Sequence, residues 1–150
     1  MSEHHERVLR IERTFDAPAE IVFEAWTSTE VLRRWLHAGP DWDTPVAEVD
    51  LRVGGTMRVA MRDPTTGPQY GASGQYQLID RPRRLIFTWI WDHQPSTAQL
   101  IELDFREHNG RTTVVLVNSS IPSDQVRDDQ RLGWHRCYDN LDRILARPSS

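Results

Sequence analysis

Between Pro45 and Ser119 the sequence contains six short runs of alternating apolar and polar residues, and turn-forming residues separate each run from the next. A further run of this kind lies near the N-terminus. Because consecutive strands joined by short turns pair antiparallel, this succession predicts one curved antiparallel sheet of about seven strands. The predicted strands are Arg7–Phe15, Val46–Val53, Thr56–Arg62, Tyr70–Asp80, Arg84–Trp91, Ala98–Arg106 and Arg111–Asn118.

After Pro122 the apolar residues recur at intervals of three and four instead of two, which indicates an amphipathic helix. Ser123 and Asp124 suit the N-terminus of this helix, and Pro148 limits its end. A helix of about 24 residues, about 36 Å long, can face the sheet with one stripe of side chains. The stripe consists of Val126, Gln130, Trp134, Cys137, Leu141, Ile144 and Leu145.

Two shorter helices are predicted between the first and second strands. Pro18 fits the first turn of a helix over Ala19–Trp26. Thr27 and Glu30 have the spacing of a capping box, so a second helix is expected to begin there and to carry Trp35 inward. A curved antiparallel sheet wrapped around one long amphipathic helix is a two-layer α+β fold.

The composition excludes several kinds of chemistry. With 150 residues, 38% of them hydrophobic, the chain can bury one core, and we expect one domain over residues 1–150 with a flexible start at residues 1–6. All 18 basic residues are Arg, so the chain has no Lys for a Schiff base or a phosphate-binding loop. The basic residues are scattered and the net charge is −4, which argues against nucleic acid as a partner.

Neither a cofactor, a metal site nor a membrane span is predicted. Cys137 is the only cysteine, so an internal disulfide and a zinc site built on a cysteine pair are excluded. The sequence has no apolar run long enough to cross a membrane, and its polar start is unlike a signal peptide. We therefore expect a cytoplasmic protein.

Large apolar side chains share the face of the predicted sheet that the long helix would cover. Phe87, Trp89 and Trp91 alternate along one strand, and Gly133 precedes Trp134 on the helix. Two interpretations stay open, since these side chains could fill a core or line a space that the curved sheet leaves beneath the helix. The residues predicted to contact a ligand in such a space are Trp35, Met57, Val59, Met61, Tyr76, Phe87, Trp89, Trp91, Ile101, Leu103, Phe105, Leu116, Asn118, Gln130 and Trp134.

Two polar residues interrupt the apolar faces. Asn118 lies near the end of a predicted strand, and Gln130 lies on the stripe of the long helix. Either amide could orient a carbonyl or hydroxyl group of a ligand. The alternative for Asn118 is a structural role, in which its side chain bonds to the backbone where the strand ends.

Candidate catalytic groups are few, and no catalytic residue is predicted. His135 and Asp139 are four residues apart on the long helix, a spacing also typical of a solvent-exposed pair. Asp41 and Asp43 flank a Trp in a loop, where exposed acids are common, and His93 is expected near the mouth of the space. The spacing of His, Asp and Glu residues matches no known metal site.

The order of the elements and several short segments resemble the helix-grip fold of the START and birch-pollen-allergen superfamily, also called SRPBCC. The resemblance is closest to the single-domain, bacterial-type proteins named after the activator of heat-shock protein ninety ATPase. It implies a lipid-binding-like cavity between the sheet and the long helix that holds apolar small molecules. The segments that carry the resemblance are Asp16–Trp26, Arg34-Trp35, Gly54-Gly55, Arg84–Trp89, Phe105–Glu107, Gly133-Trp134 and Leu141–Ile144.

Three hypotheses of function follow. The first is binding of a small hydrophobic or aromatic molecule in the cavity, without chemistry. The second is an enzyme that resembles a polyketide cyclase, a dehydratase or a hydrolase and uses the same cavity, although no inward-pointing His or carboxylate is evident. The third is a protein partner that activates a chaperone ATPase. The sequence leaves open whether the chain forms a homodimer.

Overall fold

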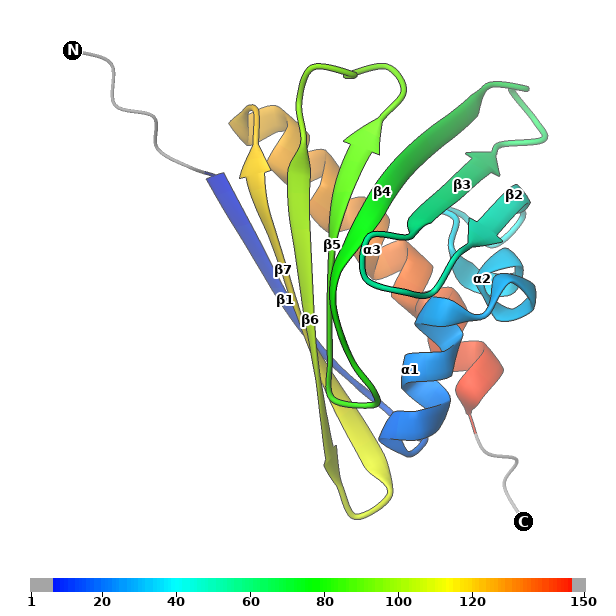
Figure 1. Cartoon of the computed structure of the whole chain (residues 1–150). Coiled ribbons are helices and arrows are strands. Elements are labelled where there is room, and N and C mark those ends of the chain that lie inside the picture. Colours follow the sequence, from blue (N-terminus) through cyan, green and yellow to red (C-terminus); the bar gives the residue numbers. More distant parts are fainter. Residues whose placement is uncertain (1–6, 147–150) are drawn as a thin grey trace.

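A computed structural model of the chain describes residues 7–146. A seven-stranded antiparallel sheet curves around three helices, as Figure 1 shows, and the order of its strands is β1-β7-β6-β5-β4-β3-β2. The predicted α+β helix-grip architecture is confirmed. The expectations for residues 1–6 and Pro148 lie outside the described residues. The elements are β1 (Arg7–Phe15), α1 (Ala19–Thr27), α2 (Thr29–Trp35), β2 (Asp43–Val49), β3 (Thr56–Arg62), β4 (Gln69–Asp80), β5 (Arg84–Trp91), β6 (Gln99–His108), β7 (Arg111–Ile121) and α3 (Asp124–Leu145).

The second strand is the one whose predicted bounds differ most from the structure. β2 begins at Asp43 and ends at Val49, where it pairs with Met57 of β3, so the prediction that it runs to Val53 is wrong. The chain turns immediately after Val49, and Gly54 takes a positive φ of 86° there, which glycine adopts without strain. Val53 lies in this turn and is 66% exposed. Its apolar side chain therefore does not mark a strand residue that faces the core.

The start of α2 also differs from the prediction. Ser28 is its N-cap, and the Ser28 hydroxyl accepts a hydrogen bond from the Val31 amide at 3.4 Å. The Thr27 hydroxyl instead donates to the carbonyl of Phe23 within α1, at 3.0 Å. The predicted capping box at Thr27 and Glu30 is therefore wrong by one residue, since the neighbouring Ser and Thr can both serve as a cap.

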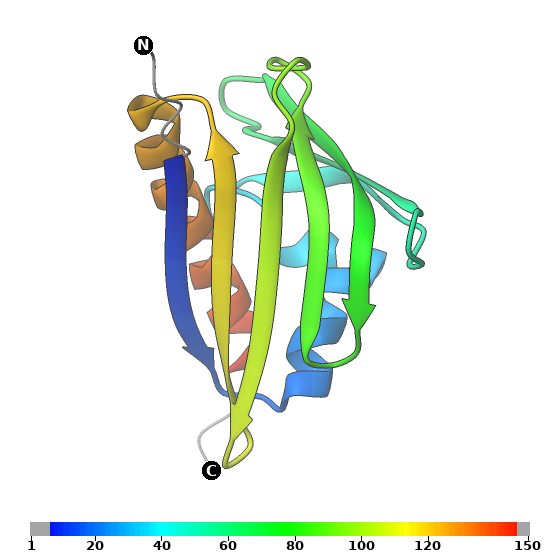
Figure 2. The same cartoon turned by 60° about the vertical axis from the view of Figure 1, so that its left-hand side comes forward.

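The concave face of the sheet carries the core, and the helices cover it. Figure 2 shows α3 behind β1 and β7, with α1 and α2 behind the middle of the sheet. Trp26 of α1 lies at the centre of an aromatic cluster, with ring centroids 4.8 Å from Trp35, 6.1 Å from Phe87, 5.7 Å from Trp134 and 6.2 Å from Tyr138. This cluster joins all three helices to β5. The buried side chain of Trp26 therefore links the helical layer to the sheet.

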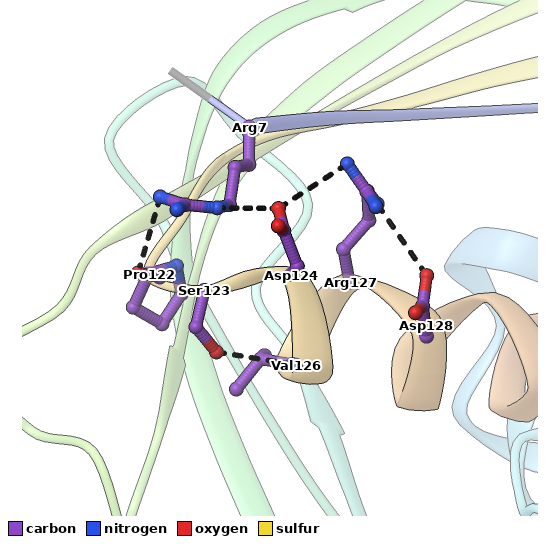
Figure 3. A network of polar contacts seen from close by, with 7 residues as sticks. All are labelled: Arg7, Pro122, Ser123, Asp124, Val126, Arg127 and Asp128. Carbon is purple, nitrogen blue, oxygen red and sulfur yellow. Dashed lines mark hydrogen bonds and ion pairs between the residues drawn. The ribbon is translucent and has the colours of Figure 1, made fainter. Parts of the chain in front are cut away.

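The first turn of α3 is held by a network of polar contacts, drawn in Figure 3. The Ser123 hydroxyl accepts a hydrogen bond from the Val126 amide at 3.1 Å, as an N-cap does. Arg7 of β1 donates through Nε to the Asp124 carboxylate at 2.7 Å, and Arg127 lies 3.5 Å from the same carboxylate. The beginning of α3 is thus fixed to the edge strand of the sheet. None of the described helices has the length and apolar character needed to cross a membrane.

The Trp26 cluster generates a prediction about stability. Replacing the buried Trp26 by Ala leaves a large void between the layers, so the free energy of unfolding should fall by about 3–5 kcal/mol. Chemical denaturation followed by circular dichroism measures this change. Leu132→Ala is the matched control, because Leu132 is 52% exposed on α3, and its effect should stay within about 0.5 kcal/mol. Equal losses in both variants would contradict a core centred on Trp26.

Candidate functional site

A pocket with a volume of about 320 Å³ lies between the first half of α3, the end of β5 and the segment that joins α2 to β2. It reaches the surface where the side chains of Tyr70 and His93 are exposed. We call it the α3–β5 pocket. Its lining residues are Ala38, Trp42, Met61, Tyr70, Trp89, Trp91, His93, Gln94, Val126, Asp129, Gln130, Gly133, Trp134 and Cys137.

The helical side of the pocket follows from the spacing of residues on α3. Val126, Gln130, Gly133 and Cys137 recur at intervals of three and four, so one face of the helix forms the wall. A Cβ atom built on Gly133 would meet no heavy atom within 4 Å. Close packing therefore does not explain this glycine, and its missing side chain leaves room in the pocket instead.

Aromatic rings form most of the opposite wall. Trp89 lies edge-on to Trp91, with ring centroids 5.2 Å apart, and 5.7 Å from Trp134 of α3. Near the rim, Trp42 stacks on Tyr70 with an angle of 11° between the ring planes and 6.0 Å between the centroids. Such pairs are held by their own ring contacts, so the wall is formed without a ligand.

Three side-chain amides form a hydrogen-bonded network behind this wall. Gln130 of α3 and Gln99 of β6 exchange two hydrogen bonds, of 2.9 and 3.0 Å, and Gln130 Nε2 also donates to Asn118 Oδ1 at 2.7 Å. The Asn118 amide in turn donates to Gln99 Oε1 at 3.0 Å. Asn118 and Gln99 are buried, at 0% and 1% exposure, so the network replaces the water that these amides lose on folding.

Two indole groups fix the orientation of these amides. An indole N–H can only donate, so Gln130 turns its oxygen to Trp91 Nε1, 3.1 Å away, and Asn118 turns its oxygen to Trp134 Nε1, 3.2 Å away. All hydrogen-bonding positions of the Gln130 amide are then used. Trp91 and Trp134 consequently offer ring surface, and not a free N–H group, to a molecule in the pocket.

The contacts of Asn118 match neither of the two interpretations in full. Its amide oxygen accepts from Gln130 and Trp134, and its nitrogen donates mainly to Gln99, with a longer contact of 3.5 Å to the Leu100 carbonyl. The main partners of Asn118 are thus side chains and not the backbone, and Asn118 does not line the pocket. Its position behind the wall supports Gln130 and Trp134.

Five of the residues predicted to contact a ligand do line the pocket, and the remaining ten lie outside its wall. The five are Met61, Trp89, Trp91, Gln130 and Trp134. The ten, which are buried among other side chains of the protein, are Trp35, Met57, Val59, Tyr76, Phe87, Ile101, Leu103, Phe105, Leu116 and Asn118. Part of the inward face is therefore filled core, while its end beside the first half of α3 borders the α3–β5 pocket.

The list of predicted contacts also omitted residues that the structure places in the wall. Val126, Gly133 and Cys137 could have been found from the same helical spacing that identified Gln130 and Trp134. Trp42 and Tyr70 could not, because they come from a loop and a strand end that only the folded chain brings together.

Most of the candidate catalytic groups lie away from the pocket. Asp43 accepts two hydrogen bonds from Arg62, of 3.2 and 2.6 Å, and Asp139 pairs with Arg13 instead of with His135. Neither Asp41 nor His135 lines the pocket, whereas His93 does. In residues 7–146 no group of three or more His, Cys, Asp and Glu side chains is placed to hold a metal ion.

Two further groups near the pocket have shifted pKa values. Burial raises the pKa of the Cys137 thiol to about 12, so this thiol is protonated at neutral pH and a poor nucleophile. Burial lowers the pKa of His37, an effect that Asp43 opposes and Arg143 supports. The Thr44 hydroxyl donates to the Leu36 carbonyl at 2.8 Å, so the hydroxyl oxygen accepts from His37 Nδ1, 2.9 Å away.

The burial of His37 predicts how stability depends on pH. Because the pKa in the folded state lies below the value of 6.5 for a free imidazole, the unfolded chain binds the proton more readily, and stability must fall as the pH drops below about 6.5. The free energy of unfolding, measured by denaturant titration between about pH 7 and pH 5, should decrease in the wild type. In His37→Gln this decrease should be smaller. An unchanged pH dependence in the variant would contradict the assignment to His37.

Comparison with known sequences gives one family. The family model described as "Activator of Hsp90 ATPase homolog 1-like protein" matches residues 16–146 of the chain. No curated protein matches the chain.

Comparison with solved structures gives the same fold. A crystal structure of a Chromobacterium violaceum protein matches with a TM-score of 0.85 at 21% identity, covering 95% of this chain and 99% of that one. The AHSA1 protein of Silicibacter pomeroyi matches with a TM-score of 0.81 at 23% identity, covering 93% and 97% of the two chains. A protein of Rhodobacter sphaeroides matches with a TM-score of 0.78 at 25% identity, covering 95% of each chain. The similarity extends over nearly the full length of each of these proteins.

Proposed function

The chain belongs to the Activator of Hsp90 ATPase homolog 1-like protein family, and from that premise we propose that it binds a small apolar or aromatic molecule in the α3–β5 pocket without chemical conversion. The observation that carries this proposal is the aromatic wall of the pocket. Trp91 and Trp134 use their N–H groups on the amides behind them, so their rings form an apolar surface facing the pocket.

The size of the pocket limits the ligand to a small molecule. A volume of about 320 Å³ lies at the lower end of the range for pockets that bind small molecules, about 300–1,000 Å³. Burial of about 200 Å² of apolar ligand surface contributes about 5 kcal/mol at about 25 cal/mol/Å², before the cost of association. We therefore expect affinities in the micromolar range for ligands of one or two rings.

The route to the pocket passes the rim, where Tyr70 is 40% exposed and His93 is also exposed. Trp42 stacks on Tyr70 at this place. Both rings have one face on protein and can add stacking contact to a flat ligand. The proposal therefore favours planar, aromatic molecules over branched aliphatic ones of equal volume.

One observation favours a second candidate function, that of an enzyme acting in the same pocket. His93 lines the pocket beside Trp91, with 5.7 Å between the ring centroids, and an imidazole in a pocket can act as a general acid or base. Conversion of a bound ligand that is lost in His93→Gln, with binding retained, would favour the enzyme. Stimulation of a chaperone ATPase, which the family description suggests, stays a prediction that an ATPase assay with and without the protein can test.

A blocked pocket provides the test of ligand binding. Gly133→Phe should place a ring in the pocket and weaken binding of an aromatic probe at least about tenfold. Leu132→Phe is the matched control, because it introduces the same side chain at the neighbouring, 52% exposed position outside the pocket wall. Titration of the intrinsic tryptophan fluorescence with a library of small aromatic compounds measures both variants and the wild type.

Folding of the blocked variant can be checked independently. A Cβ atom at position 133 meets no heavy atom within 4 Å apart from its chain neighbours and the backbone of the helix, and Phe recovers part of the cost of about 1 kcal/mol that glycine has relative to Ala in a helix. The thermal midpoint of Gly133→Phe should therefore not fall below that of the wild type. Unchanged binding in this variant, or no fluorescence response of the wild type to any compound class, would contradict the proposal.

A further inference from the structure

The charge of the α3–β5 pocket is uneven. Asp129 is the one carboxylate among its lining residues, and none of the described arginines lines it. His93 is the one side chain in the wall with a titratable nitrogen. The chain has 18 Arg residues and 22 acidic residues. In the wall of the pocket, however, the carboxylate of Asp129 has no Arg beside it.

The arginines nearest to the start of α3 are engaged by other acids. Figure 3 shows Arg7 on Asp124, and Arg127 between Asp124 and Asp128. Asp129 accepts a hydrogen bond from the neutral Gln125 amide at 3.0 Å, and within residues 7–146 its carboxylate makes no ion pair. Among the described residues Asp129 therefore has no cationic partner, and its exposed side chain is accessible to a partner outside the protein.

The other groups of the wall also suit a cation. The face of an indole ring carries partial negative charge, and Trp91 and Trp134 direct their positive N–H edges into the amide network. The side-chain oxygen of Gln94, a wall residue, is buried without a hydrogen-bond partner among the described residues, so it adds no exposed group to the wall. The N–H of Trp89 also has no partner, but it is a neutral donor and does not change the net charge of the wall.

The one carboxylate of the wall opposes an anionic ligand. The N-terminus of a helix attracts anions, but in α3 the Ser123 hydroxyl and the Asp124 carboxylate already take that position. An anion in the pocket would face Asp129 without an arginine to compensate it. A carboxylate or phosphate ligand is therefore disfavoured at this site.

We propose that the ligand of the α3–β5 pocket is an organic cation, an amine or quaternary ammonium group attached to an apolar or aromatic body. The body lies against Trp89, Trp91 and Trp134, and the cationic end lies toward Asp129. This inference rests on the proposed binding function and adds the charge of the ligand to it.

Three compounds of nearly equal shape test the charge. Benzyltrimethylammonium is the cation, neopentylbenzene is its neutral isostere, and phenylmethanesulfonate is the anion. Tryptophan fluorescence and calorimetric titration should show the cation binding about tenfold more tightly than the neutral compound, and the anion more weakly than both. The preference should decrease at high ionic strength, because Asp129 is exposed.

Asp129→Asn removes the charge and keeps the shape of the side chain. It should weaken binding of the cation about fivefold and leave binding of the neutral compound unchanged. Asp128→Asn is the matched control, since it makes the same change of net charge at the adjacent position, where the carboxylate pairs with Arg127 outside the pocket wall. This control should leave the affinities for all three compounds unchanged.

The outcomes separate the two proposals. Binding of the neutral compound with equal or weaker binding of the cation would overturn the inference about charge and leave the proposed binding function standing. Equal effects of Asp129→Asn and Asp128→Asn would also overturn it, because the cation would then respond to net charge alone. Absence of binding by all three compounds, together with no response to the wider library, would overturn both proposals.

Discussion

The paired amides of Gln99 and Gln130 join α3 to the sheet beside the α3–β5 pocket, where the two layers are not in full contact. Apolar packing alone would favour closing the gap between helix and strands. A buried amide network holds its members at hydrogen-bond distance and is costly to break, since each unpaired group loses about 1–3 kcal/mol. The network therefore sets the height of α3 above β5, and the α3–β5 pocket is the space that this height leaves.

The sequence was sufficient to predict most of the architecture. Strands such as Thr56–Arg62 and Arg84–Trp91 have the predicted bounds, because turn-forming residues such as Gly55 and Pro82 lie just before them. The exact bounds of some elements could not be predicted, because neighbouring residues suit the same structural position. Ser28 and Thr27 are both good N-caps, and the apolar Val53 resembles a strand residue although it lies in a turn.

The site was less accessible to sequence reasoning than the fold. Periodicity identifies the side chains that point inward, such as Met57 and Met61, but it does not show that only Met61 borders empty space. That distinction depends on the distance between layers, to which the amide network contributes. Asn118 illustrates the same limit, because an amide on an inward face is equally suited to bind a ligand or to support its neighbours.

The pocket combines walls of different kinds. On one side stand paired strands and α3, which the core and the amide network hold in place. On the other side, Ala38 and Trp42 belong to a short connection in which the Trp42 amide donates to the Gly39 carbonyl at 3.2 Å. Substitutions in this connection would alter the shape of the cavity while sparing the strands and their register. Under the proposed function, such substitutions would change which molecules fit the α3–β5 pocket without altering the sheet.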